Sequence, residues 1–264
     1  MDTLTKTKKI TLWQLTIILV AILASEKSIA NEQVYETGLK STVWIITKTG
    51  RGSGVLVDTE KRLVVTNHHV VDEQEKVVVY FPVFRDGRLI AEKEKYEEGN
   101  FEHAISAKII RSDAKRDLAI LKLERIPPGT TAIVLGEPAT PGQEIHSIGN
   151  PGDIDALWVY SYGRVRARYY RKFQSSQARQ FQALDNQIPI NPGDSGGPVL
   201  NNEGQLVGIN QGARLNVNLV SISVDISEIK WLLDKVNNGT ALPLHSESER
   251  EKPSLRNLSV FSRD

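Results

Sequence analysis

Short apolar runs separated by turn-forming residues fill the chain between positions 42 and 226. β-branched and aromatic side chains dominate these runs, while Gly, Pro, Asn and Asp lie between them. The clearest runs are Thr42–Thr47, Val55–Asp58, Leu63–Thr66, Val77–Phe81, Ile105–Ile110, Leu118–Leu123, Gly197–Leu200 and Gln205–Asn210. Many short strands with frequent turns are typical of an all-β sandwich or barrel rather than of alternating strands and helices.

One late segment has helical spacing instead. Its apolar positions fall at i, i+3, i+4 and i+7 and form one stripe: Ile229, Leu232, Leu233 and Val236. Asp225 is suited to cap the N-terminus, and Glu228 three residues later completes a capping-box pattern. The pattern predicts a helix over residues 226–237.

A stretch rich in proline and glycine, residues 127–142, interrupts the strand pattern. Such stretches mark connections. We therefore expect an N-terminal β lobe over residues 31–126 and a C-terminal β lobe over residues 127–239 that includes the helix. Residues 240–264 are mostly polar with mixed charge, which predicts a flexible tail.

The first thirty residues resemble a targeting segment. Lysines near the N-terminus precede an apolar run, Ile17–Ala24, and the following Ser28-Ile29-Ala30 has small residues in its first and third positions. The run is shorter than the roughly 20 residues that span a bilayer. It predicts a signal peptide cleaved near Ala30, hence a periplasmic or secreted protein without a stable membrane span. An uncleaved signal anchor is the alternative.

Composition narrows the chemistry that the chain can perform. The 264 residues include no cysteine, which excludes thiol catalysis, disulfide scaffolds and cysteine-ligated metal sites. The 33 basic and 32 acidic residues nearly cancel, so charge does not favour nucleic acid as a partner. The histidines lack metal-binding spacing, and we expect neither a cofactor nor a metal.

Two segments concentrate charge. Residues 85–103 are rich in glutamate and predict a long solvated loop or an extended hairpin. Residues 162–180 contain arginines and a lysine but no acid, and the alternation of Arg164, Arg166 and Arg168 would place these side chains on one face of a strand.

The strongest chemical signal is a serine between glycines. Residues 191–199 read Asn-Pro-Gly-Asp-Ser-Gly-Gly-Pro-Val, and the glycines allow a tight turn that leaves backbone N–H groups free to face an oxyanion. A serine nucleophile needs an imidazole base and a carboxylate that orients it. The adjacent pair His68 and His69 offers the base. Asp117, which begins an apolar strand, is the better candidate for the carboxylate, and Asp113 is the weaker one.

Taken in order, these motifs resemble the trypsin-like serine proteases of the Deg/HtrA branch. The motifs are Gly52–Val57, Thr66–Val71, Asp117–Leu121, Ser147–Pro151 and Gly193–Gly197, and the resemblance runs from about Ser41 to Val236. It implies two six-stranded antiparallel β-barrels of the chymotrypsin type, with a C-terminal helix. It also implies a serine endopeptidase that acts on polypeptides, unfolded or misfolded proteins among them.

The resemblance assigns a role to individual residues. His69 matches the base, Asp117 the orienting acid and Ser195 the nucleophile, while the N–H groups of Gly193 and Ser195 match the oxyanion hole. It places the substrate pocket at Asn186, Pro189, Ile190 and Pro192. Pro189 stands where trypsins have a pocket-floor acid, so a small or medium apolar residue is expected before the cleaved bond.

Two further expectations qualify this assignment. About 28 residues follow the predicted helix, too few for the PDZ domain that usually follows the protease in this branch. The alternative function is a binding module on a protease fold, in which the basic face over residues 164–172 holds an anionic polymer with the help of its tyrosines.

Overall fold

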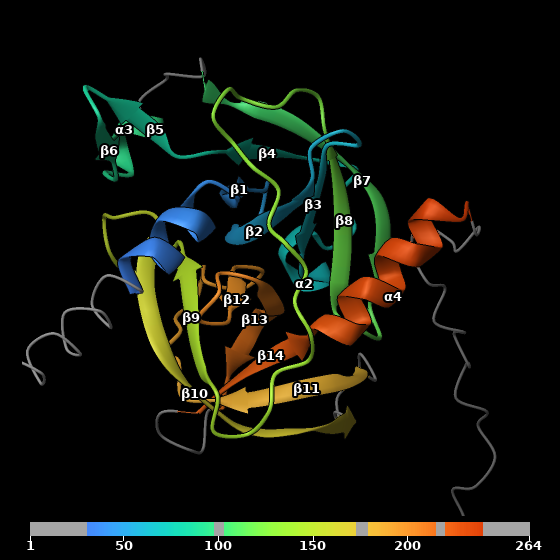
Figure 1. The fold of residues 1–264 in the computed structure, drawn as a ribbon. Helices are drawn as coiled ribbons and strands as arrows, with labels where there is room; N and C mark the ends of the chain where they lie inside the picture. Colours follow the sequence, from blue (N-terminus) through green and yellow to red (C-terminus); the bar gives the residue numbers. More distant parts are fainter. Residues whose placement is uncertain (1–30, 98–102, 173–178, 215–219, 240–264) are drawn as a thin grey trace, which may run out of the picture.

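The computed structural model describes residues 31–97, 103–172, 179–214 and 220–239, and these residues form two closed β-barrels (Figure 1). The first barrel has the strand order β1-β2-β3-β8-β7-β4 and closes through pairing of β1 with β4. Its strands are β1 (Thr42–Ile46), β2 (Arg51–Asp58), β3 (Leu63–Thr66), β4 (Lys76–Tyr80), β7 (Ile105–Asp113) and β8 (Leu118–Leu123). The predicted signal peptide and tail lie outside the described residues.

The second barrel has the order β10-β11-β14-β13-β12-β9 and closes through pairing of β12 with β9. Its strands are β9 (Glu144–Gly149), β10 (Val159–Lys172), β11 (Gln180–Asn186), β12 (Pro198–Leu200), β13 (Leu206–Ala213) and β14 (Ser221–Asp225). All neighbouring strands in both barrels pair antiparallel. The all-β fold with two six-stranded chymotrypsin-like barrels is confirmed.

The C-terminal helix forms where its apolar stripe predicts it. This helix, α4 (Ile226–Asn237), begins after Asp225, whose carboxylate accepts a hydrogen bond from Ser227 N at 2.9 Å. The capping-box prediction is wrong in its second half, because the Glu228 carboxylate instead accepts from Gln182 N and pairs with Arg116. Residues 31–39 form a helix that the sequence pattern did not predict. Among the described residues, no helix is long and apolar enough to cross a membrane.

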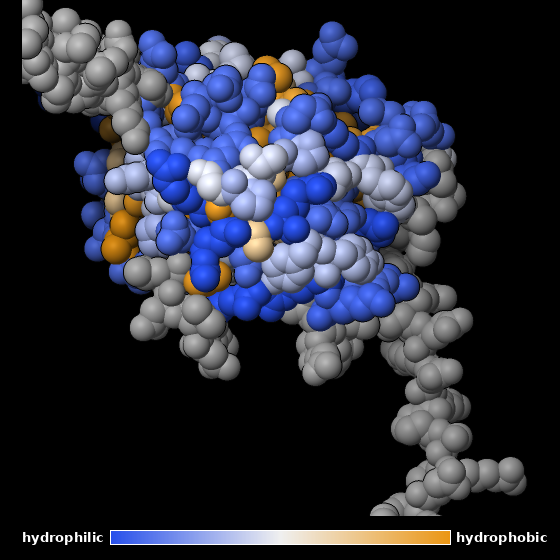
Figure 2. Space-filling view, turned by 60° about the horizontal axis from the view of Figure 1, so that its bottom comes forward, coloured by the Kyte–Doolittle hydropathy of each residue, from blue (hydrophilic) through white to orange (hydrophobic). Residues whose placement is uncertain are grey.

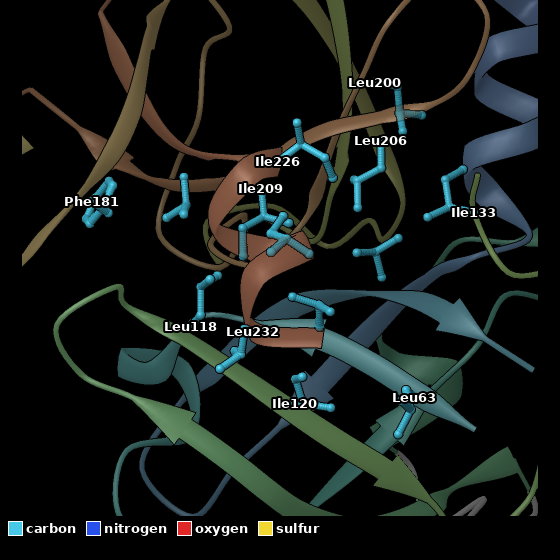
Figure 3. Packing of buried hydrophobic residues seen from close by; sticks show 14 of the residues in the cluster. Leu63, Leu118, Ile120, Ile133, Phe181, Leu200, Leu206, Ile209, Ile226 and Leu232 are labelled. Atoms are coloured by element: carbon cyan, nitrogen blue, oxygen red, sulfur yellow. The ribbon is translucent and has the colours of Figure 1, made fainter. Parts of the chain in front are cut away.

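One apolar cluster joins both barrels to α4 (Figure 3). Leu232 of α4 lies beside Leu118 and Ile120 of β8, and Ile209 and Ile226 belong to the same cluster. All five side chains are at most 1% exposed. Because Leu118 directly follows Asp117, this packing fixes the start of β8 relative to the second barrel.

The glutamate-rich segment is not a freely solvated loop. It contains a hairpin of β5 (Val83–Arg85) with β6 (Arg88–Ile90), followed by the short helix α3 (Glu94–Glu97). Lys93 and Tyr96 are only 5% and 3% exposed. The hairpin was one of the two predicted forms, but the burial of Lys93 and Tyr96 shows that the segment is docked onto the barrels, while Glu92, Glu94 and Glu97 are exposed.

The arginines of β10 do lie on the exposed face of a strand, and acids of the second barrel pair with them. Arg164 pairs with Glu144 at 3.2 Å, and Arg168 forms a bidentate ion pair with the carboxylate of Asp225 at 2.8 and 3.2 Å. Figure 2, in which the bottom of Figure 1 comes forward, shows a mostly hydrophilic surface here. Much of the positive charge of this strand is therefore neutralised within the barrel.

Candidate active site

The strand geometry of the first barrel brings His69 and Asp117 together. β3 and β8 are antiparallel neighbours that pair Thr66 with Ala119, so the end of β3 lies beside the start of β8. His69 sits on the short helix α2 (His68–Val71) that follows β3. Its Nδ1 lies 3.0 and 2.9 Å from the two oxygens of Asp117, and its backbone N–H donates to Oδ1 at 3.0 Å. The structure thus places the predicted base beside the predicted acid.

Asp117 is fully buried and held by several donors. Besides His69, the side-chain amide of Gln211 donates to Oδ2 at 3.0 Å, and the Arg179 guanidinium lies 3.2 Å from the same oxygen. Burial by itself raises the pKa of Asp117, but the hydrogen bonds and charge of His69 together with Arg179 outweigh it and hold the pKa below its ordinary value. Asp117 is therefore an anion, suited to fix the imidazole with its proton on Nδ1.

The neighbouring candidates have other partners. His68 Nδ1 contacts Ser112 Oγ at 2.7 Å, and burial lowers the pKa of this histidine. The carboxylate of Asp113 pairs with Arg116 at 3.0 Å, and Arg116 also bonds Glu228 of α4 at 2.8 Å. These contacts tie down the turn that leads into Asp117.

Ser195 lies in a loop of the second barrel that docks onto β2 of the first. Its carbonyl oxygen accepts from Ser53 N at 2.8 Å. Gly196 has φ +85°, and a Cβ there would overlap the Ser53 carbonyl oxygen, so only glycine fits. The Ser195 hydroxyl donates to Gln211 O at 3.3 Å rather than to His69.

Two backbone N–H groups of this loop have no hydrogen-bond acceptor among the described residues. Among the described residues, the N–H groups of Gly193 and Ser195 donate to no protein acceptor, whereas those of Asp194, Gly196 and Gly197 all do. The Pro192 carbonyl accepts from Gly152 N at 2.7 Å. Because the carbonyl and the N–H of a planar trans peptide point in opposite directions, this bond turns the Gly193 N–H away from Gly152. Gly193 itself lines the cleft described below.

Asp194 points away from this cleft into the protein. Its Oδ2 accepts from Asn191 N at 2.8 Å, and its carboxyl group lies against Gly149, where a Cβ would overlap it. Burial, to which Asp153 adds, raises the pKa of Asp194 to about 6, while the Asn191 N–H and Lys93 act in the opposite direction.

A cleft of about 470 Å³ contains most of the predicted site. His69, Ser195 and Gly193 line it together with the predicted pocket residues Ile190 and Pro192. The other two predicted pocket residues lie elsewhere. Asn186 is buried, with its side chain bonded to Ser223 and Ser221, and Pro189 is exposed outside the cleft lining. No carboxylate is among the described residues that line the cleft.

Sequence reasoning did not find the residues that support this site. Ser53, Gln211 and Arg179 each contact a predicted site residue from a distant part of the chain. Only Ser53, which lies within one of the quoted motifs, carried any local signal.

Residues 52–209 match the trypsin-like peptidase domain family. The chain belongs to this family. Its relatives include the putative serine protease HhoA of Synechocystis, which is 29% identical over 202 residues that make up 74% of this chain and 45% of HhoA. The periplasmic serine endoprotease DegP of Escherichia coli is 32% identical over 167 residues, or 60% of this chain and 29% of DegP. This trypsin-like peptidase is thus similar to HhoA and DegP, and it spans less than half the length of both relatives.

A solved structure shares the fold of this trypsin-like peptidase. The Rv3671c protease from M. tuberculosis in its active form superposes with a TM-score of 0.64 and 22% identity, covering 83% of this chain and 89% of that one. At this identity the likeness concerns the fold alone.

Proposed function

We propose that this chain is an exported serine endopeptidase that cleaves polypeptides through an acyl-enzyme intermediate. One observation carries the proposal: His69 is bonded through Nδ1 to the buried Asp117 and shares one cleft with Ser195 and Gly193. A neutral imidazole whose Nδ1 proton faces a carboxylate has Nε2 free to accept the serine proton.

The reaction begins when Ser195 Oγ attacks the substrate carbonyl and His69 Nε2 takes the hydroxyl proton. The carbonyl oxygen becomes an oxyanion that accepts hydrogen bonds from the N–H groups of Gly193 and Ser195. As the intermediate collapses, His69 gives its proton to the departing amine. Water then attacks the acyl ester with His69 again as the base, which releases the second product and restores Ser195.

The free protein needs one adjustment before this step. The Ser195 hydroxyl donates to Gln211 O, so a rotation about its Cα–Cβ bond precedes proton transfer to His69. Catalytic hydrogen bonds often tighten only when substrate is bound.

Substrate preference follows from the cleft lining. Ile190 and Ala213 offer apolar surface, and no carboxylate among the described lining residues would attract a cationic side chain. We therefore infer a small or medium apolar residue before the cleaved bond, in polypeptides that include unfolded or misfolded proteins. Profiling of cleavage sites in a peptide library tests this preference, and cuts clustered after Arg or Lys would refute it.

Export is supported by two observations. The N-terminal pattern is that of a signal peptide, and DegP of Escherichia coli is described as periplasmic. The N-terminal sequence of the protein recovered from an exporting cell should begin near residue 31.

A binding module that uses the basic face of β10 is the weaker alternative. Arg164, Arg168 and Arg171 lie beside Glu144, Asp225 and Asp185 respectively. These acids reduce the charge available to an anionic polymer. Retention on heparin that Ser195→Ala keeps and that replacement of Arg164, Arg166 and Arg168 abolishes would favour the alternative.

Casein digestion tests the proposed activity. The wild-type chain should release peptides, whereas Ser195→Ala and His69→Ala should release none above background. Asp117→Asn should retain folding and lose roughly 10⁴-fold in kcat, because the imidazole then adopts the wrong tautomer. Equal digestion by wild type and Ser195→Ala would contradict the proposal.

A further inference from the structure

The docked segment of residues 85–97 reaches the catalytic loop through Lys93. This side chain is 5% exposed, and its ammonium group donates to the carbonyl oxygens of Pro151 and Ile154. Its backbone N–H also donates to Asp155 O at 3.1 Å. One buried lysine therefore donates hydrogen bonds to three carbonyl oxygens of the segment that connects β9 to β10, two from its ammonium group and one from its backbone N–H.

The same turn controls the peptide that precedes the catalytic serine. Gly152 lies between the two carbonyls that Lys93 binds, and its N–H donates to Pro192 O at 2.7 Å. That bond fixes the Pro192–Gly193 peptide with the Gly193 N–H directed oppositely. Gly193 has φ +104°, and a Cβ there would overlap Asn150 O. The loop that contains Gly193 and Ser195 therefore lies in close contact with the segment that begins at Asn150.

We propose that Lys93 is a positioning residue for the oxyanion hole, which it aligns through the 151–154 turn. The inference rests on the proposed function, because it assigns the docked segment a task in that reaction. The charge never touches the substrate. The ammonium group holds the Pro151 and Ile154 carbonyls of the 151–154 turn close together, which keeps Gly152 N–H within hydrogen-bonding distance of Pro192 O. The Gly193 N–H then keeps its orientation toward the developing oxyanion.

The surroundings of Lys93 are those of a buried side chain held in one position rather than those of a mobile surface charge. Burial lowers the pKa of Lys93, and Arg51 acts in the same direction. The two carbonyl acceptors offset this cost of burying an ammonium group. Tyr96, three residues later, packs against Trp158 with ring centroids 5.3 Å apart. Leu157 N donates to Ala91 O at 2.8 Å, which holds the segment against the residues just before β10.

The kinetic test compares Lys93→Met with Lys95→Met, a matched change of an exposed lysine in the same segment. Loss of a whole oxyanion donor reduces kcat by about 10²–10³. A misaligned donor should reduce the kcat of Lys93→Met on labelled casein by roughly 10–100-fold, with KM within about twofold. Lys93→Gln keeps one donor group, so its kcat should lie between those of Lys93→Met and wild type. The kcat of Lys95→Met should match that of wild type. A folded Lys93→Met with unchanged kcat would overturn the proposal.

A second readout does not depend on activity. In Ser195→Ala protein, hydrogen exchange of the Gly152 amide should be slow, because its N–H is bonded to Pro192 O. Adding Lys93→Met, or Lys93→Gln if the methionine variant does not fold, should accelerate that exchange at least tenfold, whereas adding Lys95→Met should not. Unchanged protection would overturn the role of Lys93 even if the wild type cleaves casein. Faster exchange in the Lys93 variant together with an inactive wild type would refute the proposed function alone. The role of Lys93 in positioning the 151–154 turn would still hold.

Discussion

The Ser53 hydroxyl of the first barrel donates to the Gly193 carbonyl of the second, with 2.9 Å between Oγ and O. Ser53 Oγ in turn accepts a hydrogen bond from Asn150 N at 3.0 Å. Ser53 is fully buried and lies on β2. One hydroxyl therefore connects the barrel that holds the proposed base to the loop that holds the proposed nucleophile and to the turn beside it.

Replacing Ser53 with alanine should impair both stability and turnover. The change leaves the Gly193 carbonyl and the Asn150 N–H without this partner in a buried site, which costs about 1–3 kcal/mol in the free energy of unfolding. Because the Gly193 peptide loses an anchor, kcat should fall roughly tenfold, equivalent to about 1.4 kcal/mol in the barrier. Urea unfolding and casein kinetics measure the two effects.

Ser106→Ala is the matched control, since Ser106 lies on the exposed face of β7. It should leave both quantities near wild type. A Ser53→Ala protein as stable and as fast as Ser106→Ala would show that the interbarrel bond has no role.

The sequence could predict the barrels and the proposed reacting residues because both leave local patterns in the chain. Alternating burial gives β7 its pattern of Ile105, Ala107 and Ile109 inward and Ser106 and Lys108 outward. The motifs around His69 and Ser195 are short and contiguous.

The supporting contacts are different in kind. Gln211 and Asp117 are 94 residues apart, and Ser53 and Gly193 are 140 apart. No periodicity or spacing encodes such pairs, because the closure of two barrels creates them. Lys93 likewise reads as part of a solvated charge run until the docking of its segment buries it.

Arg179 should stabilise the protein at neutral pH by pairing with Asp117. The pKa of Asp117 is lower in the folded protein than its ordinary value of 3.8, so its stabilising contribution is present above about pH 4 and is lost as the pH falls through the folded pKa. Arg179→Gln removes one partner of a buried carboxylate and should cost about 1–3 kcal/mol at pH 7. The gap from wild type should shrink below about pH 4.

Urea unfolding followed by circular dichroism between pH 3 and 8 measures this gap. Arg166→Gln, which changes an exposed arginine of β10, should show no comparable difference. A gap that grows as the pH falls would have the wrong sign for the Arg179–Asp117 pair.

Asp194 should show the opposite pH dependence. Its pKa of about 6 in the folded protein lies above the ordinary 3.8, so the folded state favours the protonated form. The associated stability is fully present below about pH 4 and is lost as the pH rises to about 6. Asp194→Asn stays neutral and can still accept from Asn191 N, so it should be more stable than wild type by about 3 kcal/mol at pH 8 and nearly equal to it near pH 3.5.

Asp86→Asn, at the exposed tip of the β5–β6 hairpin, provides the control and should follow wild type across the range. If Asp194→Asn were less stable than wild type at pH 8, the ionised carboxylate would be a favourable part of the loop and the pKa would be depressed, not raised.

Labelling with a fluorophosphonate tests most directly whether Ser195, His69 and Asp117 act as one catalytic unit. Mass spectrometry of the intact, folded chain should show one adduct, and peptide mapping should place it on Ser195. The adduct should be absent in Ser195→Ala and should form at least about 10³-fold more slowly in His69→Ala, because the hydroxyl then lacks its base. A folded wild-type chain that takes no label, or a label that persists in Ser195→Ala, would contradict the account.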